Sequence, residues 1–544
     1  MAVPATRSAT PRPADAPRRR LAELRALVSA QPEPRSPVGH DGAEDELAGV
    51  VVTGVTQDSR AVVGGDLYVA RPGGSTHGAA YAQQAAAAGA AAVLTDPTGL
   101  ERCRAAGLPT LVVSDPQGVL GAVSAWVYGY PARDLTVLGV TGTNGKTTTA
   151  FLLDAALRHL GRRTGQLGTV GTRIGDETLP SVRTTPEAPD LQAILAVMRE
   201  RGVSHVSMEV SSHALTYGRV DGLVFDVAGF TNLSQDHLEL HGDMEAYFAA
   251  KAALFGPDRS RRGVINLDDT HGARLAVLAR EWGLDIVTYS ATGAPAADWR
   301  AAEVSSSPDG LSHFVLHGPN GGPWPVTLGL PGTFNVANAV LATAMLAGAG
   351  LSPETFLPAL ATASLPGRME RVSEPGAAFA AIVDYAHTPD AIAIVLSSVR
   401  GWTKGRVIGV FGCGGDRDHA KRPLMGEAAA RHADLAVVTD DNPRSEDPAA
   451  IRAAALRGAY GVPASLRGEV VEIGDRRQAI ERAIGAARPG DTVLILGKGH
   501  EQGQDVGGVV QPFDDRLVVQ EVLRQMSDTI GTARADARKK GAER

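Results

Sequence analysis

The chain has 544 residues, which exceeds what one hydrophobic core usually supports, so roughly three domains of about 150 residues each are expected. Hydrophobic residues make up 44% and charged residues 21% of the chain, as in an ordinary soluble globular protein. The formal net charge of -7 gives no reason to expect a nucleic-acid partner, because a non-specific nucleic-acid binder needs a basic face.

Cysteine and charge patterns favour a cytoplasmic location. The two cysteines, Cys103 and Cys413, are too few for a disulfide framework or a thiolate metal site, and they suit a reducing compartment. No apolar run approaches the roughly 20 residues of a membrane span, so no membrane association is expected. The cluster Arg18–Arg20 is followed by charged residues where a secretion signal would be apolar.

The first part of the chain predicts a tail and a small domain. Residues 1–45 are rich in Pro, Ala, Arg and acidic residues and predict a mostly disordered tail, with a short helix near Leu21–Val28. Residues 46–132 predict an α/β domain in which strands alternate with an Ala-rich helix over Ala79–Gly89. Its strand candidates are Val50–Val52, Leu67–Val69, Ala91–Leu94 and Leu111–Val113.

Residues 133–365 predict a central domain with a parallel, helix-covered sheet. It opens with the strand Leu135–Val140, a Gly-rich turn and the helix Thr147–Leu160, which Gly161 ends. The segment Gly293–Pro325 is rich in Pro, Gly and Ser and predicts an irregular or hairpin insertion. Further strand candidates are His205–Met208, Phe225–Phe230, Val264–Leu267 and Ile286–Tyr289.

Residues 366–530 repeat the alternation of strands and helices and predict a third α/β domain, followed by a charged tail over 531–544. Its strand candidates are Ala381–Val383, Val407–Phe411, Leu435–Val438 and Val493–Leu496. The predicted fold class is therefore α/β, in three domains.

The segment Gly139–Thr147, between the first strand and helix of the central domain, has the composition of a phosphate-binding loop. Its glycines let backbone N–H groups turn inward, and the helix N-terminus adds partial positive charge. Lys146 can reach the β- and γ-phosphates of a nucleotide, and the Thr147 hydroxyl can ligate Mg²⁺. A Gly-rich connection with an incidental lysine is disfavoured, because both the strand and the helix are in place.

The glycines fall at the spacing G-x-x-G-x-x-G-K-T, with Val140 where the general phosphate-loop pattern has Gly. This variant, which reads Gly142-Thr143-Asn144-Gly145-Lys146-Thr147-Thr148, resembles the loop of the Mur ligases and of their relative folylpolyglutamate synthase. The resemblance extends from about Thr56 to Arg516. It implies a central P-loop parallel-sheet ATPase domain, flanked by an N-terminal UDP-binding domain and a C-terminal Rossmann-like, amino-acid-binding domain.

Several polar residues follow strand candidates, so they should converge at the carboxyl edge of a parallel sheet, where oxygen ligands and an imidazole suit Mg²⁺. The resemblance assigns Thr147 and Glu209 to a first Mg²⁺ site and His237 to a second. It also implies that Lys251 is carbamylated, which turns a repelling ammonium into an anionic oxygen ligand. Taken alone, His237 and Lys251 would be ordinary surface or core residues. The expected catalytic residues are Lys146, Glu209, His237 and Lys251, and the expected ATP contacts outside the loop are Asn335, Arg368, Asp384 and His387.

Two further sets of residues, in the first and central domains, resemble the residues with which the family binds a UDP-muramyl dipeptide. In the first domain, Asp58-Ser59-Arg60 and the loop Gly73–Gly78 offer N–H groups and hydroxyls for a diphosphate, and without the resemblance both segments would be turns. Tyr217 stands where some relatives carry an amide side chain. The residues expected to bind this substrate are Ser59, Gly74, Ser75, Thr76, Thr184, Thr185, Ser211, Tyr217 and Arg219.

The third domain carries residues that suit diaminopimelate, an amino acid that reacts through one amine and presents a second zwitterionic head at its far end. The forked cations Arg417 and Arg444 suit the distal carboxylate, and Glu501 suits the ammonium, with help from the Gly497 carbonyl. Lysine lacks that carboxylate and would leave Arg444 unpaired. The expected diaminopimelate-binding residues are Arg417, Asp441, Asn442, Pro443, Arg444, Gly497 and Glu501.

The resemblance thus implies a monomeric, cytoplasmic ATP- and Mg²⁺-dependent ligase that adds diaminopimelate to UDP-N-acetylmuramoyl-L-alanyl-D-glutamate through an acyl phosphate. A lysine-adding ligase or a folylpolyglutamate synthase would share the ATP chemistry. A phosphotransferase or P-loop NTPase switch would form no amide and would not need Arg417, Arg444 and Glu501. A catalytically silent binding module would tolerate the loss of Lys146, Glu209 or Lys251. All three residues are present, which disfavours this alternative.

Overall fold

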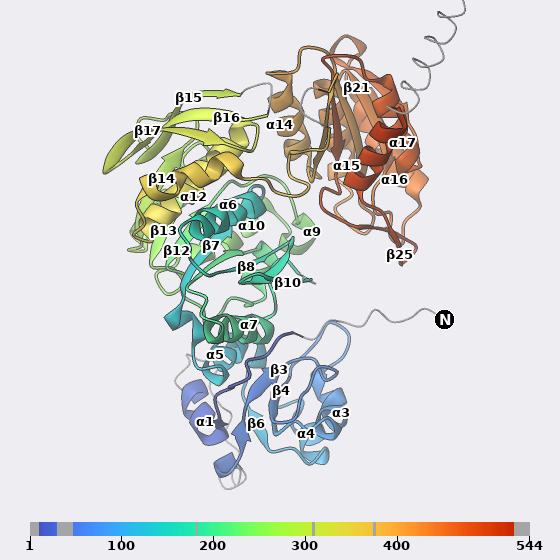
Figure 1. Cartoon of the computed structure of the whole chain (residues 1–544). Coiled ribbons are helices and arrows are strands. Elements are labelled where there is room, and N and C mark those ends of the chain that lie inside the picture. Colours follow the sequence, from blue (N-terminus) through green and yellow to red (C-terminus); the bar gives the residue numbers. More distant parts are fainter. Residues whose placement is uncertain (1–9, 30–46, 181–182, 307–309, 374–376, 527–544) are drawn as a thin grey trace, which may run out of the picture.

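The computed structural model describes residues 10–29, 47–180, 183–306, 310–373 and 377–526. It contains three α/β domains that follow one another along the chain (Figure 1). In these described parts, no helix is both long and apolar enough to cross a membrane.

The N-terminal domain is built on a four-stranded parallel sheet in the order β3-β4-β5-β6. Three of its four strands were predicted, whereas β3 was missed. The strands are β3 (Gly54–Thr56), β4 (Asp66–Ala70), β5 (Ala92–Thr95) and β6 (Thr110–Val112). The helices are α3 (Ala82–Ala87), α4 (Leu100–Ala105) and α5 (Pro116–Val127).

The prediction of a disordered tail is wrong for residues 10–29, which pack against the N-terminal domain. Strand β1 (Arg19–Arg20) pairs antiparallel with β2 (Val51–Val52), and the predicted short helix is present as α1 (Leu21–Ser29). Leu21, Leu24 and Val28 of α1 are buried at helical spacing, which explains why α1 docks on the domain. The rest of the predicted tail, residues 1–9 and 30–45, lies outside the described residues.

An ion pair fastens this segment to the domain. The guanidinium of Arg12 contacts both carboxylate oxygens of Asp66, and the Nη2–Oδ2 distance is 2.8 Å. Asp66 is 1% exposed, so removal of the cation would leave a buried carboxylate without its partner.

Replacement of Arg12 by alanine is therefore expected to lower the free energy of unfolding of the N-terminal domain by about 2 kcal/mol. Urea denaturation followed by circular dichroism measures this change. Arg18→Ala, at an exposed position of the same segment, serves as the matched control. Equal stability of the two variants would show that the Arg12–Asp66 pair does not fasten the segment.

The central domain contains an eleven-stranded sheet in the order β10-β9-β8-β11-β7-β12-β13-β14-β15-β16-β17. The strands from β8 to β15 are parallel, as predicted for the core of the sheet. These core strands are β7 (Thr136–Thr141), β8 (Thr164–Gly168), β11 (His205–Glu209), β12 (Val227–Phe230), β13 (Arg262–Asn266), β14 (Asp285–Ser290) and β15 (Trp299–Ser306). The covering helices include α6 (Lys146–His159), α7 (Ala188–Glu200), α11 (Thr270–Glu281) and α12 (Thr333–Gly348).

Antiparallel strands extend both edges of this sheet. On one edge are β9 (Gly171–Ile174) and β10 (Glu177–Leu179). On the other edge, β16 (Ser312–Gly318) and β17 (Gly321–Leu328) pair antiparallel with β15 and with each other. The hairpin alternative predicted for Gly293–Pro325 is therefore confirmed, and the irregular one is wrong.

The C-terminal domain has a six-stranded sheet in the order β18-β19-β23-β20-β21-β22, parallel apart from β18. The strands are β18 (Glu370–Arg371), β19 (Ala380–Asp384), β20 (Val407–Cys413), β21 (Leu435–Asp440), β22 (Glu469–Glu472) and β23 (Thr492–Leu496). The helices are α14 (Pro389–Arg400), α15 (Lys421–His432), α16 (Pro448–Gly461) and α17 (Arg476–Ala486). The hairpin β24 (Gly503–Val506) and β25 (Val509–Pro512) was not predicted, and the predicted tail 531–544 lies outside the described residues.

Candidate active site

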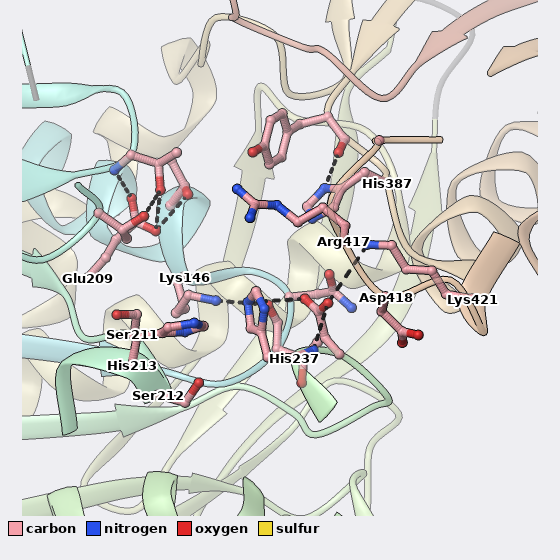
Figure 2. Close-up of a pocket in the computed structure, with 18 of the residues that line it drawn as sticks. Lys146, Glu209, Ser211, Ser212, His213, His237, His387, Arg417, Asp418 and Lys421 are labelled. Carbon is pink, nitrogen blue, oxygen red and sulfur yellow. Dashed lines mark hydrogen bonds and ion pairs between the residues drawn. The ribbon is translucent and has the colours of Figure 1, made fainter. Parts of the chain in front are cut away.

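A cavity of about 520 Å³ lies where the central and C-terminal domains face each other. Strand β7 is in the middle of the central sheet, flanked by β11 and β12, and the carboxyl ends of these strands open into the cavity. Such a crevice at the strand ends is where open α/β sheets bind ligands. Figure 2 shows Lys146, Glu209 and His237 of the central domain on one side and His387, Arg417 and Lys421 of the C-terminal domain on the other.

The loop after β7 has the conformation of a phosphate cradle. Gly142 and Gly145 have φ angles of 139° and 89°, and a Cβ on either residue would meet a side-chain oxygen at 1.8 or 2.3 Å, so only glycine fits. Asn232 holds the loop, since its carbonyl accepts from the Thr143 N–H and its side chain from the Asn144 N–H. The N–H groups of the first turn of α6, including Thr147 and Thr148, lack helical partners and suit phosphate oxygens.

An oxygen cluster beside the loop suits a hard divalent cation. Glu209 ends β11, is 2% exposed, and accepts hydrogen bonds from the Thr147 hydroxyl at 2.8 Å and from the Thr169 N–H at 2.7 Å. Among the described residues, no cation forms an ion pair with Glu209, although a buried carboxylate is costly without one. Hydroxyl and carboxylate oxygens are the ligands Mg²⁺ prefers, so the predicted pair Thr147 and Glu209 fits the ion.

Two lysines converge on the loop carbonyls. Lys146 Nζ donates to the carbonyls of Gly142 and Thr143 at 2.9 and 2.8 Å, and Lys251 Nζ donates to the Gly142 carbonyl at 2.7 Å. Burial, together with the charge of Lys146, holds the pKa of Lys251 well below its usual value. None of the described carboxylates forms an ion pair with Lys251, which is 1% exposed. Burial therefore favours the uncharged form of the Lys251 amine.

His237 lies beside other imidazoles and acidic groups. Its ring contacts that of His213 with the centroids 4.7 Å apart, and ligand atoms of His213, His237 and Glu239 lie within 4.8 Å of one another. Burial lowers the pKa of His237 and brings that of His213 to about 4, so both rings are neutral, the form that can ligate a metal. The contacts of His237 in the described structure include those with Asp236, Glu239 and His213, and none is with Thr147 or Glu209. This is compatible with the prediction that His237 belongs to a second metal site.

Arg368 connects the domains, whereas two other predicted ATP contacts do not reach the cavity. The Arg368 guanidinium donates to the Thr147 hydroxyl at 3.2 Å and lies over the ring of Tyr385. Asp384 is buried and accepts from the N–H groups of Met369 and Ala386, so its carboxylate fastens the domain connection and does not line the cavity. The predicted contact of Asp384 with ATP is not supported by this placement.

Asn335 is also buried away from the cavity lining. Its amide donates to the Pro331 carbonyl, and its oxygen accepts from Asn338, whose own oxygen lies under Gly145. His387 does line the cavity, and burial brings its pKa to about 4. Asn335 therefore supports the phosphate loop indirectly, through Asn338, whereas His387 faces the cavity.

Three of the predicted dipeptide residues lie on one wall of the cavity. Thr184, Ser211 and Arg219 line it directly. The Thr185 hydroxyl donates to the Glu209 carbonyl at 2.9 Å and so fixes the end of β11. Tyr217 is 44% exposed and does not line the cavity, although the Arg219 guanidinium lies over its ring.

The predicted UDP-binding residues lie on the N-terminal domain, outside the interdomain cavity. Gly74, Ser75 and Thr76 form an exposed loop after β4. Ser59 follows β3 and donates to the Gln84 side chain at 3.1 Å. Both segments follow the carboxyl ends of neighbouring parallel strands, so they lie at one edge of the small sheet.

The predicted diaminopimelate residues converge on the C-terminal side of the cavity, which Arg417, Asp441, Asn442, Arg444, Gly497 and Glu501 all line. Arg444 has a φ angle of 51° and donates to the Gly415 carbonyl at 2.6 Å. Pro443 does not line the cavity but shapes the turn, because its carbonyl leaves no room for a side chain at position 415.

Lys498 belongs to this cluster but was not assigned a role from the sequence. Its side chain is 0% exposed, and its amine contacts Glu501 Oε2 at 3.0 Å and Asn442 Oδ1 at 3.1 Å. Asn442 Nδ2 also donates to Glu501 Oε2 at 2.9 Å. The one feature of the sequence that could have pointed to Lys498 is its position directly after the predicted binding residue Gly497.

Other cavity residues were also missed. Lys421, at the start of α15, lies 3.9 Å from the carboxylate of Asp236 across the domain boundary. Although burial opposes ionisation, neighbouring cationic groups that include Lys421 and Lys146 hold the pKa of Asp236 below its usual value. Lys421 carries no local motif, so only the fold brings it to the site.

Family comparisons agree with this architecture. The family model described as "Mur ligase family, catalytic domain" matches residues 51–128, "Mur ligase middle domain" matches 140–346, and "Mur ligase, glutamate ligase domain" matches 367–499. A phosphate-loop domain that shares its cavity with a Rossmann-like domain is thus the arrangement of a three-domain ATP-dependent ligase. The chain belongs to the Mur ligase family.

Similar proteins cover nearly the whole chain. A UDP-N-acetylmuramoyl-L-alanyl-D-glutamate–2,6-diaminopimelate ligase of Streptomyces avermitilis is 55% identical over 92% of this chain and 98% of its own length. The protein of that name from Corynebacterium glutamicum is 49% identical over 84% of this chain and 89% of its own length. A solved structure with that title matches with a TM-score of 0.64 and 34% identity, covering 90% of this chain and 98% of its own. The predicted three-domain α/β fold is confirmed.

Proposed function

We propose that this chain is the ATP-dependent ligase that joins diaminopimelate to UDP-N-acetylmuramoyl-L-alanyl-D-glutamate, and that it works as a monomer in the cytoplasm. The observation that carries this proposal is a single cavity lined by both Lys146 of the phosphate loop and Arg444 with Glu501 of the C-terminal domain. A nucleotide and a zwitterionic amino acid can therefore meet there. The names of the relatives from Streptomyces and Corynebacterium support this substrate pair.

The reaction has two balanced steps. An oxygen of the dipeptide's terminal γ-carboxylate attacks the γ-phosphorus of ATP, and ADP leaves to give an acyl phosphate. The amine nitrogen of diaminopimelate then attacks the acyl carbon, phosphate leaves, and the nitrogen loses a proton to form the amide. Lys146 and Arg368 offset the negative charge that gathers in the first step. Mg²⁺ held by Thr147 and Glu209 would supply further charge neutralisation on the phosphates.

The amino-acid head fits the cluster on the C-terminal side. The guanidinium groups of Arg417 and Arg444 suit its distal carboxylate. Both contacts of Glu501 with neighbouring side chains use Oε2, which leaves Oε1 for the ammonium group. Lysine has no distal carboxylate, so a lysine-adding ligase would keep an unpaired guanidinium in this cavity.

Two other functions are compatible with this fold, namely that of a ligase that adds a different amino acid and that of a folylpolyglutamate synthase. A relative from Leifsonia xyli, 44% identical, is named UDP-N-acetylmuramyl-tripeptide synthetase, a name without an amino acid. A folylpolyglutamate synthase structure shares the fold at 19% identity and a TM-score of 0.56, covering 70% of this chain. The N-terminal domain and Arg444 favour the UDP-linked substrate and diaminopimelate over both.

Isotope transfer tests the two-step chemistry. When the γ-carboxylate of the dipeptide carries oxygen-18, one labelled oxygen should appear in the released phosphate, because that oxygen bridges carbon and phosphorus in the acyl phosphate. Mass spectrometry of the phosphate measures the transfer. Unlabelled phosphate alongside tripeptide formation would rule out the acyl phosphate.

Carbamylation of Lys251 is a second part of the proposal. An unprotonated amine, which the lowered pKa of Lys251 favours, attacks CO₂, a C–N bond forms, and one proton is lost, so that a carbamate oxygen would be available as a metal ligand beside His237. Protein incubated with ¹³C-bicarbonate is expected to show a carbamate carbon signal by NMR that Lys251→Ala lacks. The same variant should lose most of its ligase activity, by about a hundredfold. An unchanged spectrum with full activity in the variant would contradict the assignment.

A further inference from the structure

Glu187 lies between the substrate wall of the cavity and the N-terminal domain. It directly precedes α7 at the N-cap position, with φ −64° and ψ 153°, yet its side chain makes no capping hydrogen bond. The side chains that normally accept from the first turn of a helix at this position are the shorter ones of Ser, Thr, Asp and Asn. Here the carboxylate contacts three side chains, that of Arg183 four residues earlier and those of Arg219 and Gln57 from other segments, so it serves tertiary structure.

The first two of these partners are guanidinium groups. Glu187 Oε1 lies 3.0 Å from Arg219 Nη2 and 3.3 Å from Arg183 Nε. Both arginines line the cavity, and their positive charges repel each other. One carboxylate between two guanidiniums leaves a net positive charge for an anionic substrate group.

Arg219 depends on this contact. Its side chain is 12% exposed, and its Nε atom is buried without a hydrogen-bond partner among the described residues. Burial lowers the pKa of Arg219, and the charge of Glu187 opposes that effect. Without Glu187, the contact with the ring of Tyr217 would be the side-chain contact left to the guanidinium within the described parts of the chain.

The third partner belongs to the N-terminal domain. Gln57 Nε2 donates to Glu187 Oε2 at 3.1 Å, and Gln57 Oε1 accepts from Arg71 Nε at 2.8 Å. Gln57 directly precedes the segment 58–60, and Arg71 lies two residues before the start of the loop 73–78. The same carboxylate is therefore linked to both loops expected to grip the uridine diphosphate.

We propose that Glu187 is a positioning residue that holds Arg219 toward the dipeptide and ties it through Gln57 to the nucleotide-binding loops. The two ends of one long substrate are then held at a fixed separation, which strengthens binding as a rigid link between two binding modules does. This inference rests on the proposed substrate, UDP-N-acetylmuramoyl-L-alanyl-D-glutamate.

Steady-state kinetics of Glu187→Gln test the role. The KM for UDP-N-acetylmuramoyl-L-alanyl-D-glutamate is expected to rise about tenfold or more, because a buried charge pair is broken. The KM values for ATP and diaminopimelate should stay within about twofold, and so should the affinity for UDP alone measured by calorimetry, since these ligands do not span both domains. A general loss of structure would instead alter all of these values together with the melting temperature.

Two matched variants sharpen the test. Glu177→Gln removes another Glu–Arg pair of the same domain, with Arg201, and should leave every KM unchanged. Gln57→Met should also raise the KM for the nucleotide dipeptide, and its combination with Glu187→Gln should add no more than about twofold, because the two residues act as one unit. Fully additive effects would overturn the link to the N-terminal domain.

The outcomes separate this inference from the proposed function. If the unaltered protein forms no tripeptide, the proposed function is wrong and the role of Glu187 falls with it. If the unaltered protein forms tripeptide and Glu187→Gln keeps its KM for the nucleotide dipeptide, only the role of Glu187 is overturned.

Discussion

Replacement of Lys146 by alanine is expected to lower kcat for ADP formation by about a thousandfold, the largest loss for any single change in this chain. The Lys146 amine lies at the phosphate loop, 2.9 and 2.8 Å from the carbonyls of Gly142 and Thr143. It is the lysine placed to offset phosphate charge as the γ-phosphoryl group moves to the dipeptide. A coupled assay of ADP release, run with all three substrates, measures the change.

Lys404→Ala is the matched control, because Lys404 lies exposed on the C-terminal domain. The Lys146→Ala protein should keep a melting temperature close to that of the unaltered protein, since Asn232 still holds the loop after the contacts of the lysine are lost. ADP release from Lys146→Ala at the rate of the control would show that phosphoryl transfer takes place elsewhere.

Replacement of Arg444 by alanine is expected to weaken diaminopimelate binding by about 2–5 kcal/mol, which is a rise in KM of at least about thirtyfold. The distal carboxylate would lose a guanidinium that the fold holds firmly in place. The backbone of Arg444 is fixed by the hairpin β24–β25, through bonds from its N–H to the Asp505 carbonyl and from the Gly507 N–H to its own carbonyl.

The measurement is tripeptide formation as a function of diaminopimelate concentration. The KM for ATP should change by less than about twofold, because Arg444 is on the opposite side of the cavity from the phosphate loop. Arg457→Ala, on an exposed position of α16, provides the control. Unchanged saturation by diaminopimelate in Arg444→Ala would refute the assigned role.

Local sequence signals predicted those parts of the site that are formed by one contiguous segment of the chain. The strand, the glycines and the helix around Lys146 are contiguous, and their spacing alone defines a phosphate loop. Glu209 could be placed because it ends a strand-like run, and strand ends of a parallel sheet share one edge. Arg444 could be placed because the chemistry of a zwitterionic head calls for a forked cation.

Contacts between distant segments could not be predicted. Lys421 reaches Asp236 only because two domains face each other, and neither residue carries a signal for the other. Asp384 has the composition of a ligand contact, yet two backbone N–H groups take up its carboxylate. The polar segment 10–20 looks disordered by composition, but Asp66, more than fifty residues away, supplies the carboxylate that orders it.

Incubation of the purified protein with ATP, Mg²⁺ and UDP-N-acetylmuramoyl-L-alanyl-D-glutamate, with meso-diaminopimelate, LL-diaminopimelate or L-lysine in parallel, tests the central claim most directly. Mass spectrometry should detect the UDP-linked tripeptide with at least one diaminopimelate isomer, and far less product with L-lysine at the same concentration. No tripeptide with either isomer, or faster product formation with L-lysine, would contradict the account.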